Sequence, residues 1–429
     1  MRLKLHNILK VEEADIELGG LTVITGENDS GKSSIGKILF SLLKAVNNVR
    51  RGDKFKAIDD IFREIVSIQQ FFVNKGVSLY SLPNARTTSY DLIDHNVSTK
   101  EYYDLIMITA DKNKFDARRT AILRNKLEHI NQIIFKLDNP EKALVNEFEA
   151  ISRSEFIEPL NSHNTTDSEI YFHDDTTNAD GNNINITFKD GEITHLKVSG
   201  KSSLEDITYI ESPVYLHILD SLRMSNSPSG NYGKIPYHLS DMADKLLSPS
   251  IESLYYNENN YTSQLDEISS IIKGTFEVDE ETKQLYFKKD GMSIPTVSVA
   301  SGIKSFGMLM QLIKTGNIST SRMLVLDEPE IHLHPEWQIN FCRLIVELVA
   351  QGVPIVVSSH SPYFIQGLRY FSAARGIEKD VKYYMSEINA NNGLSTFNNV
   401  TDDLNKVFTL LAAPLQEIMN VDAVRNSLR

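Results

Sequence analysis

The sequence predicts an α/β fold, in which helices cover a largely parallel sheet and a helical segment interrupts the chain. Three apolar runs, 21–25, 323–326 and 354–357, have the length of buried strands and end in glycine or polar residues. The helical pattern 336–351 has the length of a crossover between the last two runs. Ligands of such sheets bind at the carboxyl ends of the strands, so we expect the polar residues after each run to lie together.

Length, composition and charge narrow the class of protein. With 429 residues, the chain exceeds what one hydrophobic core usually serves, and its 41% apolar and 24% charged residues are ordinary for a globular protein. The net charge of −13 means that binding to nucleic acid or anionic lipid would need a local basic patch. Cys342 is the single cysteine, which excludes an internal disulfide and a cysteine-based zinc site.

The chain shows no sign of a membrane segment. No apolar run approaches the roughly 20 residues that span a bilayer, and residues 1–10 lack the apolar centre of a signal peptide. We therefore expect a cytoplasmic protein without membrane contact.

Residues 1–55 are expected to form a β-rich lobe and the first helix. Apolar and polar residues alternate in two stretches, and the turn 19–20 leads into the run 21–25. The alternating apolar residues are Leu3, Leu5, Ala14, Ile16 and Leu18. Apolar residues at helical spacing predict a helix that starts near residue 35 and ends at about Val49.

Residues 26–34, GENDSGKSS, match the phosphate-binding pattern G-x-x-x-x-G-K-[ST] between a predicted strand and helix. In this context glycines let backbone N–H groups close around a phosphate at the positive end of the helix. Lys32 is then expected to reach the β- and γ-phosphate oxygens, and the Ser33 hydroxyl to ligate Mg²⁺. The predicted binding residues are Gly26, Asn28, Asp29, Ser30, Gly31, Lys32, Ser33 and Ser34. The alternative is a chance match in a Gly/Ser turn.

Residues 56–199 are expected to form a helical insertion with a polar loop and a hairpin. Amphipathic spacing predicts helices to about Leu160, and a heptad-like stripe suits either a helix pair or the core of a helical lobe. The stripe consists of Leu123, Leu127, Ile130, Ile134 and Leu137. Residues 161–183 are polar and predict an exposed excursion, whereas 184–198 predict a hairpin with its turn at 190–191.

Basic residues crowd one helical segment of this insertion. They are Lys112, Lys114, Arg118, Arg119, Arg124 and Lys126. Such a cluster indicates a solvated helix face or, alternatively, a contact with DNA, RNA or an acidic partner.

Residues 200–429 carry the second group of candidate site residues. Asp327 and Glu328 follow the run 323–326, where Asp327 would hold the water shell of Mg²⁺ and Glu328 would polarise the attacking water. His360, after the run 354–357, can contact the γ-phosphate and orient that water.

The same part of the chain contains further predicted elements. These are a strand at 208–210, a loop at 225–236, helices to about 273, a hairpin turning at 290–291, a strand at 382–387 with a partner near 396, and a helix at 402–419. Only about 70 residues follow His360, which is short for an added nuclease domain.

The segments GENDSGKSS, LVLDEPEIHLHP and VVSSHSP together resemble the Walker A, Walker B and histidine motifs of ATP-binding-cassette (ABC) ATPases of the SMC, Rad50, RecF and OLD group. The resemblance covers about residues 1–50 and 205–400. It implies a P-loop ABC-type head that uses ATP and Mg²⁺. Within this group the chain is similar to stand-alone ATPase subunits of bacterial anti-phage systems of Septu or PARIS type, which work with a separate nuclease or toxin.

Members of this group also carry a signature, Leu-Ser-x-Gly-x-x, which closes on the γ-phosphate bound by a partner subunit. Residues 299–304, VASGIK, occupy its place, with Ala300 instead of the usual serine. The resemblance implies that Ser301, Gly302 and Lys304 contact nucleotide bound by a second copy, and hence a homodimer or higher homo-oligomer. The alternative is an ordinary capped helix.

We therefore expect a subunit that binds and hydrolyses ATP, dimerises head to head and controls a separate effector, a nuclease or toxin, in anti-phage defence. One alternative is a DNA-repair or DNA-tethering ATPase of RecF or Rad50 type. Another is a nucleotide-locked scaffold with little turnover, which Ala300 suggests. Glu211 is the candidate for the Mg²⁺-sensing position that glutamine usually holds in this group.

Two other patterns in the sequence have weaker support. His332 and His334 suggest a metal pair, but no third ligand accompanies them at metal-site spacing. Residues 358–360, Ser-Ser-His, suggest a hydrolase only superficially, since no nucleophile elbow is present.

Overall fold

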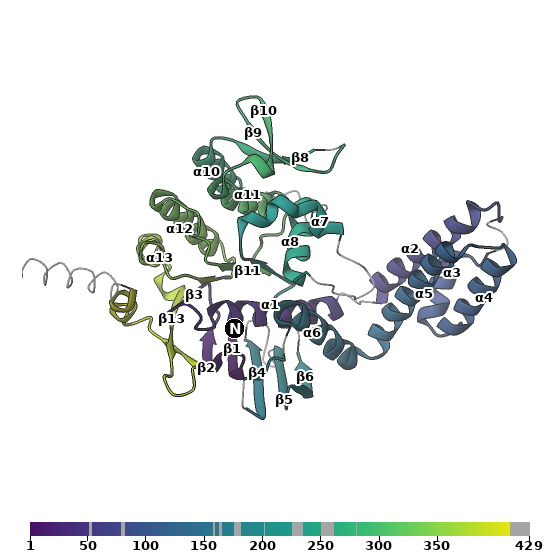
Figure 1. Ribbon diagram of the computed structural model, residues 1–429, viewed down its shortest axis with the longest axis horizontal. Coiled ribbons are helices and arrows are strands. Elements are labelled where there is room, and N and C mark those ends of the chain that lie inside the picture. The colour runs from purple at the N-terminus through teal and green to yellow at the C-terminus, as the bar shows by residue number, and fades with distance from the viewer. Residues whose placement is uncertain are drawn as a thin grey trace, which may run out of the picture. The chain divides into compact units, whose positions relative to one another are not determined.

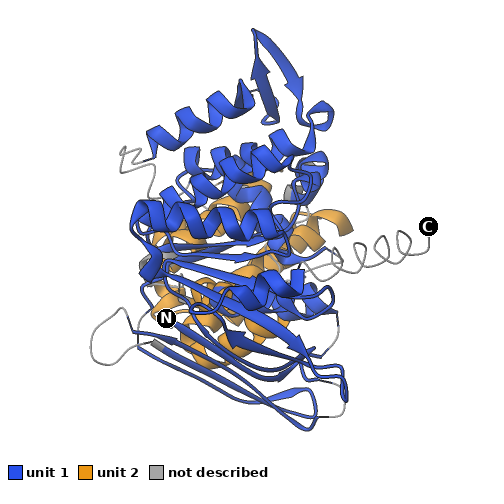
Figure 2. Cartoon of the chain, turned by 90° about the vertical axis from the view of Figure 1, so that its left-hand side faces the viewer, with its two compact units in different colours: residues 1–43, 151–226, 233–429 blue, residues 44–150, 227–232 orange. Residues whose placement is uncertain are grey.

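The computed structural model describes residues 1–50, 54–78, 82–157, 159–162, 165–175, 182–200, 202–224, 235–249, 261–279 and 281–411. The chain forms two compact units, shown in different colours in Figure 2. Unit 1 contains Met1–Leu43 and the described residues from Ile151 onward, and unit 2 contains Lys44–Ala150.

An eleven-stranded sheet forms the centre of unit 1 (Figure 1), with the order β6-β5-β4-β1-β2-β14-β13-β3-β12-β11-β7. Its strands are β1 (Arg2–Ile8), β2 (Val11–Glu17), β3 (Leu21–Thr25), β4 (Asp167–Asp174), β5 (Asn182–Lys189), β6 (Glu192–Ser199), β7 (Asp206–Ile210), β11 (Arg322–Asp327), β12 (Ile355–Ser358), β13 (Val381–Ile388) and β14 (Ser395–Asn399). The half from β13 to β7 is parallel, and the half from β6 to β2 is antiparallel. The three predicted apolar runs therefore lie side by side as β3, β12 and β11.

Helices cover the parallel half. The described helices of unit 1 are the first part of α1 (Lys32–Arg50), the end of α6 (Pro140–Phe156), α7 (Leu219–Met224), α8 (Tyr237–Leu247), α10 (Thr262–Ile272), α11 (Ser301–Lys314), α12 (Pro335–Ala350) and α13 (Pro362–Arg375), with short 3-10 turns at η2 (Pro213–Ile218), η3 (Thr296–Ser298) and η4 (Glu378–Asp380). All residues of β3, β11 and β12 are buried, as expected for strands covered on both faces.

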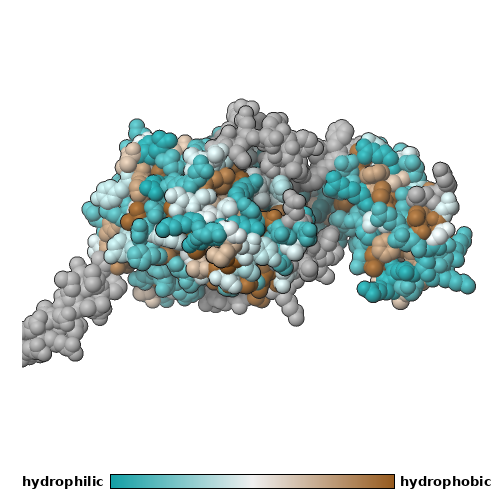
Figure 3. Space-filling model, turned by 90° about the horizontal axis from the view of Figure 1, so that it is seen from above, coloured by the Kyte–Doolittle hydropathy of each residue, from teal (hydrophilic) through white to brown (hydrophobic). Residues whose placement is uncertain are grey.

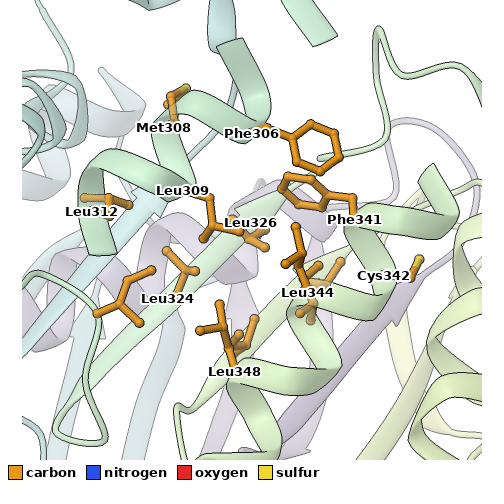
Figure 4. Packing of buried hydrophobic residues seen from close by; sticks show 14 of the residues in the cluster. Phe306, Met308, Leu309, Leu312, Leu324, Leu326, Phe341, Cys342, Leu344 and Leu348 are labelled. Carbon is orange, nitrogen blue, oxygen red and sulfur yellow. The ribbon is translucent and has the colours of Figure 1, made fainter. Parts of the chain in front are cut away.

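The hydrophobic core of unit 1 includes the layer between β11, α11 and α12, shown in Figure 4. Leu326 of β11 lies between Leu309 of α11 and Phe341 of α12, and all three side chains are buried. Burying one such side chain stabilises the fold by about 1.5–3 kcal/mol. This packing fixes the end of β11, where the carboxylates of the candidate site begin.

A separate three-stranded sheet has the order β10-β9-β8. Its strands are β8 (Thr275–Val278), β9 (Leu285–Lys289) and β10 (Met292–Pro295). Asp290 and Gly291 join β9 to β10 with φ angles of 48° and 76°, the positive values that tight hairpin turns require. The predicted hairpin is confirmed.

Unit 2 is a helical unit built on α2 (Lys54–Val73), α3 (Ala85–Ile93), α4 (Thr99–Lys112) and α5 (Ala117–Asp138). Asn84, Ser98 and Asp116 cap the last three helices, and Ser98 forms a capping box with Glu101. The stripe on α5 lies in the core of this unit together with residues of α2, α3 and α4. The reading as a core stripe is therefore confirmed.

The expectation that residues 161–183 form an exposed excursion is wrong. Residues 167–174 are β4, which pairs with both β1 and β5. Ile170 and Phe172 are fully buried. Asp174 is buried too, and its Oδ2 accepts hydrogen bonds from Ser202 Oγ and Ser203 N at 3.1 and 2.8 Å, which offset the cost of burying the carboxylate. Alternate positions face the core, so a polar composition conceals a strand.

The division of the chain differs from the expected one at 56–199. The hairpin β5–β6 has its turn at 190–191 as predicted, but it extends the sheet of unit 1 and does not belong to the helical unit. The predicted loop 225–236 and helix 402–419 lie outside the described residues, apart from 235–236 and 402–411.

In the part of the chain that the structure describes, no helix is long and apolar enough to span a bilayer. The face shown in Figure 3 is mostly hydrophilic, with small separate hydrophobic areas.

Candidate active site

The loop 26–31 connects β3 to α1 and surrounds the ammonium group of Lys32, the first residue of α1. Lys32 Nζ donates hydrogen bonds to the carbonyl oxygens of Gly26 and Glu27 at 3.1 and 2.7 Å. Gly26 has a φ of 147°, and a Cβ there would lie 1.7 Å from Ser386 Oγ of β13. Glycine is therefore required where the loop leaves the sheet.

Lys32 is almost completely buried, with 5% of its surface exposed. Burial lowers the pKa of its ammonium group, while Glu328 and Asp327 act in the opposite direction. The ammonium group of Lys32 thus lies near the carboxylates at the end of β11. Its positive charge can attract a polyanionic ligand to this position.

The Asp327 carboxylate is held by hydroxyl groups from both neighbouring strands. Ser358 of β12 donates its Oγ–H to Oδ1, and Tyr209 of β7 donates its Oη–H to Oδ2 at 2.7 Å. Burial raises the pKa of Tyr209, so its hydroxyl remains a donor. Parallel pairing of β7, β11 and β12 brings these groups together.

Glu328 faces His360 across the same sheet edge. Its Oε1 lies 3.0 Å from His360 Nδ1, and its backbone N–H donates to the Ser358 carbonyl at 3.0 Å. The φ of Glu328 is 48°, a left-handed conformation that costs free energy in a non-glycine residue and is typical of functional positions. A carboxylate next to an imidazole can orient a water molecule and accept its proton.

Glu330 is a site residue that the sequence patterns did not single out. Its Oε1 accepts hydrogen bonds from Ser359 Oγ at 2.5 Å, from His360 N at 3.2 Å and from Ser361 N at 3.3 Å. Its side chain is buried, and burial raises the pKa of the carboxyl group. Glu330 therefore ties the loop that carries His360 to the loop that carries Glu328. Its place in the segment LVLDEPEIHLHP, two residues after Glu328, is the signal that could have pointed to it.

The loop and Glu328 line one large open cavity of about 1490 Å³, whereas Asp327 is not among its lining residues. Residues 28–34 and Glu328 line it, as do Lys10, Asn161 and the turn 391–394. Ligand sites usually enclose about 300–1,000 Å³, so a nucleoside triphosphate has room here. The donor set also fits this ligand: the Lys32 ammonium group, serine hydroxyls and the Glu328 carboxylate line the cavity, and Asp327 next to Glu328 is suited to hydrated Mg²⁺.

The predicted signature lies at the start of α11 and does not line this cavity. Ala300 is the N-cap residue and makes no side-chain cap, which leaves N–H groups of the first turn without that partner. A Cβ on Gly302 would lie 3.3 Å from the His332 carbonyl oxygen of the same chain. The Ser301 and Gly302 positions are partly exposed.

Lys304 differs from its predicted role as a phosphate contact. The side chain is buried, with 1% exposed, and its Nζ contacts Nε2 of His217 in η2. Burial lowers the pKa of this ammonium group. Lys304 is the fourth residue of α11, and its side chain packs against η2 instead of facing solvent. In this conformation it supports the helix.

The remaining candidates have roles within the fold. The His334 side chain caps α12 by accepting a hydrogen bond from Glu336 N at 3.4 Å. Glu211 Oε2 lies 3.2 Å from His238 Nε2 and 3.5 Å from Lys37 Nζ, and the hydrogen bond with His238 lowers the pKa of its carboxyl group. Glu211 borders a small cavity of about 20 Å³ that Asp327 and Glu328 also line.

Comparison with known proteins yields one extensive match and one short one. The family model described as AAA ATPase domain matches residues 1–365. Septu protein PtuA of Bacillus thuringiensis is 30% identical over 67 residues, which are 15% of this chain and only 17% of that protein.

Solved structures match at low identity. The SMC head domain from Thermotoga maritima is 14% identical with a TM-score of 0.39, and the match covers 93% of this chain and 98% of that chain. The SmcHead bound to the C-winged helix domain of ScpA is 13% identical with a TM-score of 0.42, covering 94% and 98%.

Proposed function

Because the chain belongs to the AAA ATPase domain family, we propose that it binds and hydrolyses ATP at the cavity beside the loop 26–34. One observation carries the proposal. The Glu328 carboxylate and the His360 imidazole form a pair 3.0 Å apart, and Glu328 lines the same cavity as Lys32. Lys32 can therefore bind phosphates on one side of this cavity, and Glu328 with His360 can activate water on the other side.

The chain's own residues divide the work. Lys32 and the loop N–H groups bind the phosphates, and the Ser33 hydroxyl and Asp327 would hold hydrated Mg²⁺. Bound Mg²⁺ would neutralise charge on the phosphates. Glu328 accepts a proton from the attacking water, and His360 orients that water near the γ-phosphate. Glu330 accepts hydrogen bonds from the loop that carries His360 and thereby holds His360 near Glu328.

We infer a head-to-head homodimer or higher oligomer. Ser301 and the backbone N–H of Gly302, at the uncapped start of α11, would contact the γ-phosphate bound by a second copy. Support comes from the geometry of one chain: α11 does not line its own cavity, and its first turn retains N–H donors. The missing hydroxyl at Ala300 predicts a weaker clamp than a serine would make.

We further propose that the ATP-dependent state controls a separate effector, a nuclease or toxin, in anti-phage defence in the cytoplasm. The short match to Septu protein PtuA and the motif resemblance support this. A nucleotide-locked scaffold is the limiting case in which turnover is negligible.

Two substitutions test the ATPase proposal. Lys32→Ala should abolish nucleotide binding, because it removes the charge that meets the ground-state phosphates. Glu328→Gln should retain binding but lower kcat by about 10²–10⁴, the usual contribution of a positioned general base. Fluorescent-nucleotide titration and phosphate release measure the two properties. Lys379→Ala and Glu378→Gln, at exposed positions in η4, are matched controls. Wild-type turnover in Glu328→Gln would refute its assignment.

A second candidate function, DNA tethering, is favoured by exposed basic side chains in unit 2. Lys112, Lys114, Arg118 and Arg124 are exposed, whereas Arg119 is partly exposed and pairs with Asp116, and Lys126 pairs with Glu64. Repeating the turnover assay with duplex DNA distinguishes the candidates. DNA-stimulated turnover that Arg118→Glu/Arg124→Glu abolishes would favour tethering, whereas no DNA retention at moderate salt would exclude it.

A further inference from the structure

A buried chain of contacts lies behind the Asp327 carboxylate. Tyr209 of β7 is 1% exposed, and its hydroxyl donates to Asp327 Oδ2 at 2.7 Å. Ser358 holds the other carboxylate oxygen, Oδ1. Both oxygens of Asp327 are thus bound by hydroxyl groups, which prevents rotation of the carboxylate about its terminal torsion.

The ring of Tyr209 occupies a space that α1 leaves open. A Cβ on Gly36 would lie 2.8 Å from Cε2 of Tyr209 and 3.0 Å from Cγ1 of Val325, so α1 can carry only glycine here without a shift. Glycine within a helix costs about 0.5–1 kcal/mol relative to alanine. A helix glycine that admits this one aromatic ring indicates that the position of the ring is specific.

His238 of α8 fixes the other side of the ring. Its imidazole lies at 67° to the Tyr209 ring with centroids 4.9 Å apart. The Glu155 carboxylate binds His238 at two points. Oε1 accepts a hydrogen bond from the His238 backbone N–H at 2.9 Å, and Oε2 lies 2.6 Å from His238 Nδ1. Glu155 and His238 are both buried, so neither is free to adopt another rotamer.

We propose that Tyr209 is a positioning residue for the Mg²⁺ site: its hydroxyl, with that of Ser358, holds Asp327 in the orientation that binds hydrated Mg²⁺. The inference rests on the proposed function, since it gives Asp327 that task. His238, held by Glu155, and Gly36 keep the tyrosine hydroxyl within reach of the carboxylate. Without the hydroxyl, Asp327 rotates about the one remaining contact, and Mg²⁺ binds less tightly.

Tyr209→Phe tests this inference because it removes the hydroxyl and leaves the ring in its space. In the wild type, Mg²⁺ should increase ADP affinity over that in EDTA, measured by fluorescent-ADP titration. In Tyr209→Phe, ADP affinity in EDTA should be unchanged, while the Mg²⁺ concentration for half-maximal tightening should rise about 10-fold, the loss expected for one hydrogen bond to a charged group. Mn²⁺ binding, followed by electron paramagnetic resonance with ADP present, should weaken by the same factor.

A purely structural role for the hydroxyl is excluded by two comparisons. Tyr383→Phe is the matched control, because Tyr383 is a buried tyrosine of the same sheet whose hydroxyl has no hydrogen-bond partner among the described residues. It should leave the Mg²⁺ dependence unchanged. In an Asp327→Ala background, Tyr209→Phe should cause no further loss of Mn²⁺ affinity, since the group through which it acts is gone.

The outcomes separate this inference from the function on which it rests. Unchanged Mg²⁺ and Mn²⁺ binding in Tyr209→Phe, in a protein whose wild type binds both with ADP, would overturn the positioning role alone. An equal loss in Tyr383→Phe would overturn it as well. A wild type whose ADP binding ignores Mg²⁺ would overturn both the inference and the proposed Mg²⁺-dependent site.

Discussion

His238 is a residue in which burial and pairing oppose each other. Burial lowers the pKa of its imidazole, but hydrogen bonds with Glu155 and Glu211 outweigh this effect and hold the pKa above its ordinary value of 6.5. The folded state therefore binds the proton more tightly than the unfolded chain. The stability that this provides is fully present below the unfolded pKa and is lost as pH rises through the folded pKa.

The raised pKa of His238 predicts how the stability of the nucleotide-free protein changes with pH. The free energy of unfolding of His238→Gln should differ most from that of the wild type at low pH, and the difference should shrink as pH rises above 6.5. Urea unfolding between about pH 5 and pH 8 measures it. His195→Gln, at an exposed position on β6, is the control. A difference that stays constant over this range would contradict the pairing of a charged imidazole.

Positive φ angles occur at Asp29 and Glu328 in the candidate site and at His332 in the segment that follows Glu328. Asp29, Glu328 and His332 have φ angles of 64°, 48° and 67°, although none is glycine. Such conformations cost about 1–3 kcal/mol each and persist only where the surroundings enforce them. Replacing Glu328 by glutamine leaves the free-energy cost of this backbone conformation unchanged. The Glu328→Gln variant therefore tests the role of the carboxylate alone.

Among the elements, α11 lacks a side-chain cap at its N-terminus, as do α8 and α10. Ser361 caps α13 and His334 caps α12 with side-chain hydrogen bonds, whereas Ala300 of α11 makes none. Ala300 has the extended conformation of a cap residue, with φ −61° and ψ 144°. The backbone is thus ready for a capping side chain that the sequence does not provide.

Ala300→Ser should therefore raise the free energy of unfolding by about 0.5–2 kcal/mol, the usual effect of an N-cap hydroxyl. The same hydroxyl can bind a phosphate of a second copy, so we also expect tighter ATP-dependent association or faster turnover. Denaturant unfolding and phosphate release measure these effects. Ala374→Ser, at an exposed position within α13, should change stability by less than about 0.5 kcal/mol. Equal effects of both serines would argue against a cap.

On the scale of the whole molecule, the proposed trans contact predicts that ATP promotes association. A nucleotide bound beside the phosphate-loop motif 26–34 would leave part of its γ-phosphate exposed. Contacts of a second head with this exposed phosphate would stabilise the dimer. Glu328→Gln should therefore sediment as a larger species with Mg-ATP than without it. A sedimentation coefficient that ignores nucleotide would contradict the trans site.

The design of that experiment follows from the position of Gly302. A side chain there would press on the His332 carbonyl of the same chain, so Gly302→Asp would disturb the head itself. Ser301→Glu, which adds negative charge at a partly exposed position, should block association by repelling phosphate. Ser270→Glu, at an exposed position in α10, is the matched control and should associate normally.

The places of the loop 26–31, the Asp327–Glu328 pair and His360 at one edge of the sheet could be predicted from the sequence because local spacing specifies them. Each follows a short apolar run, and parallel strands place their carboxyl ends at one edge. The fold class followed from the same runs, and the hairpins from turn residues at 190–191 and 290–291.

Other features depend on contacts between residues far apart in the chain, which no local pattern encodes. Tyr209 meets Asp327 across 118 residues, and Ser386 meets Ser30 across 356. β4 is a strand because β1 and β5 offer it hydrogen-bond partners, despite its polar composition. Lys304 turns inward because His217 and the packing of α11 surround it. Only packing in three dimensions selects such partners, since the free energy of a buried polar group depends on which groups lie beside it.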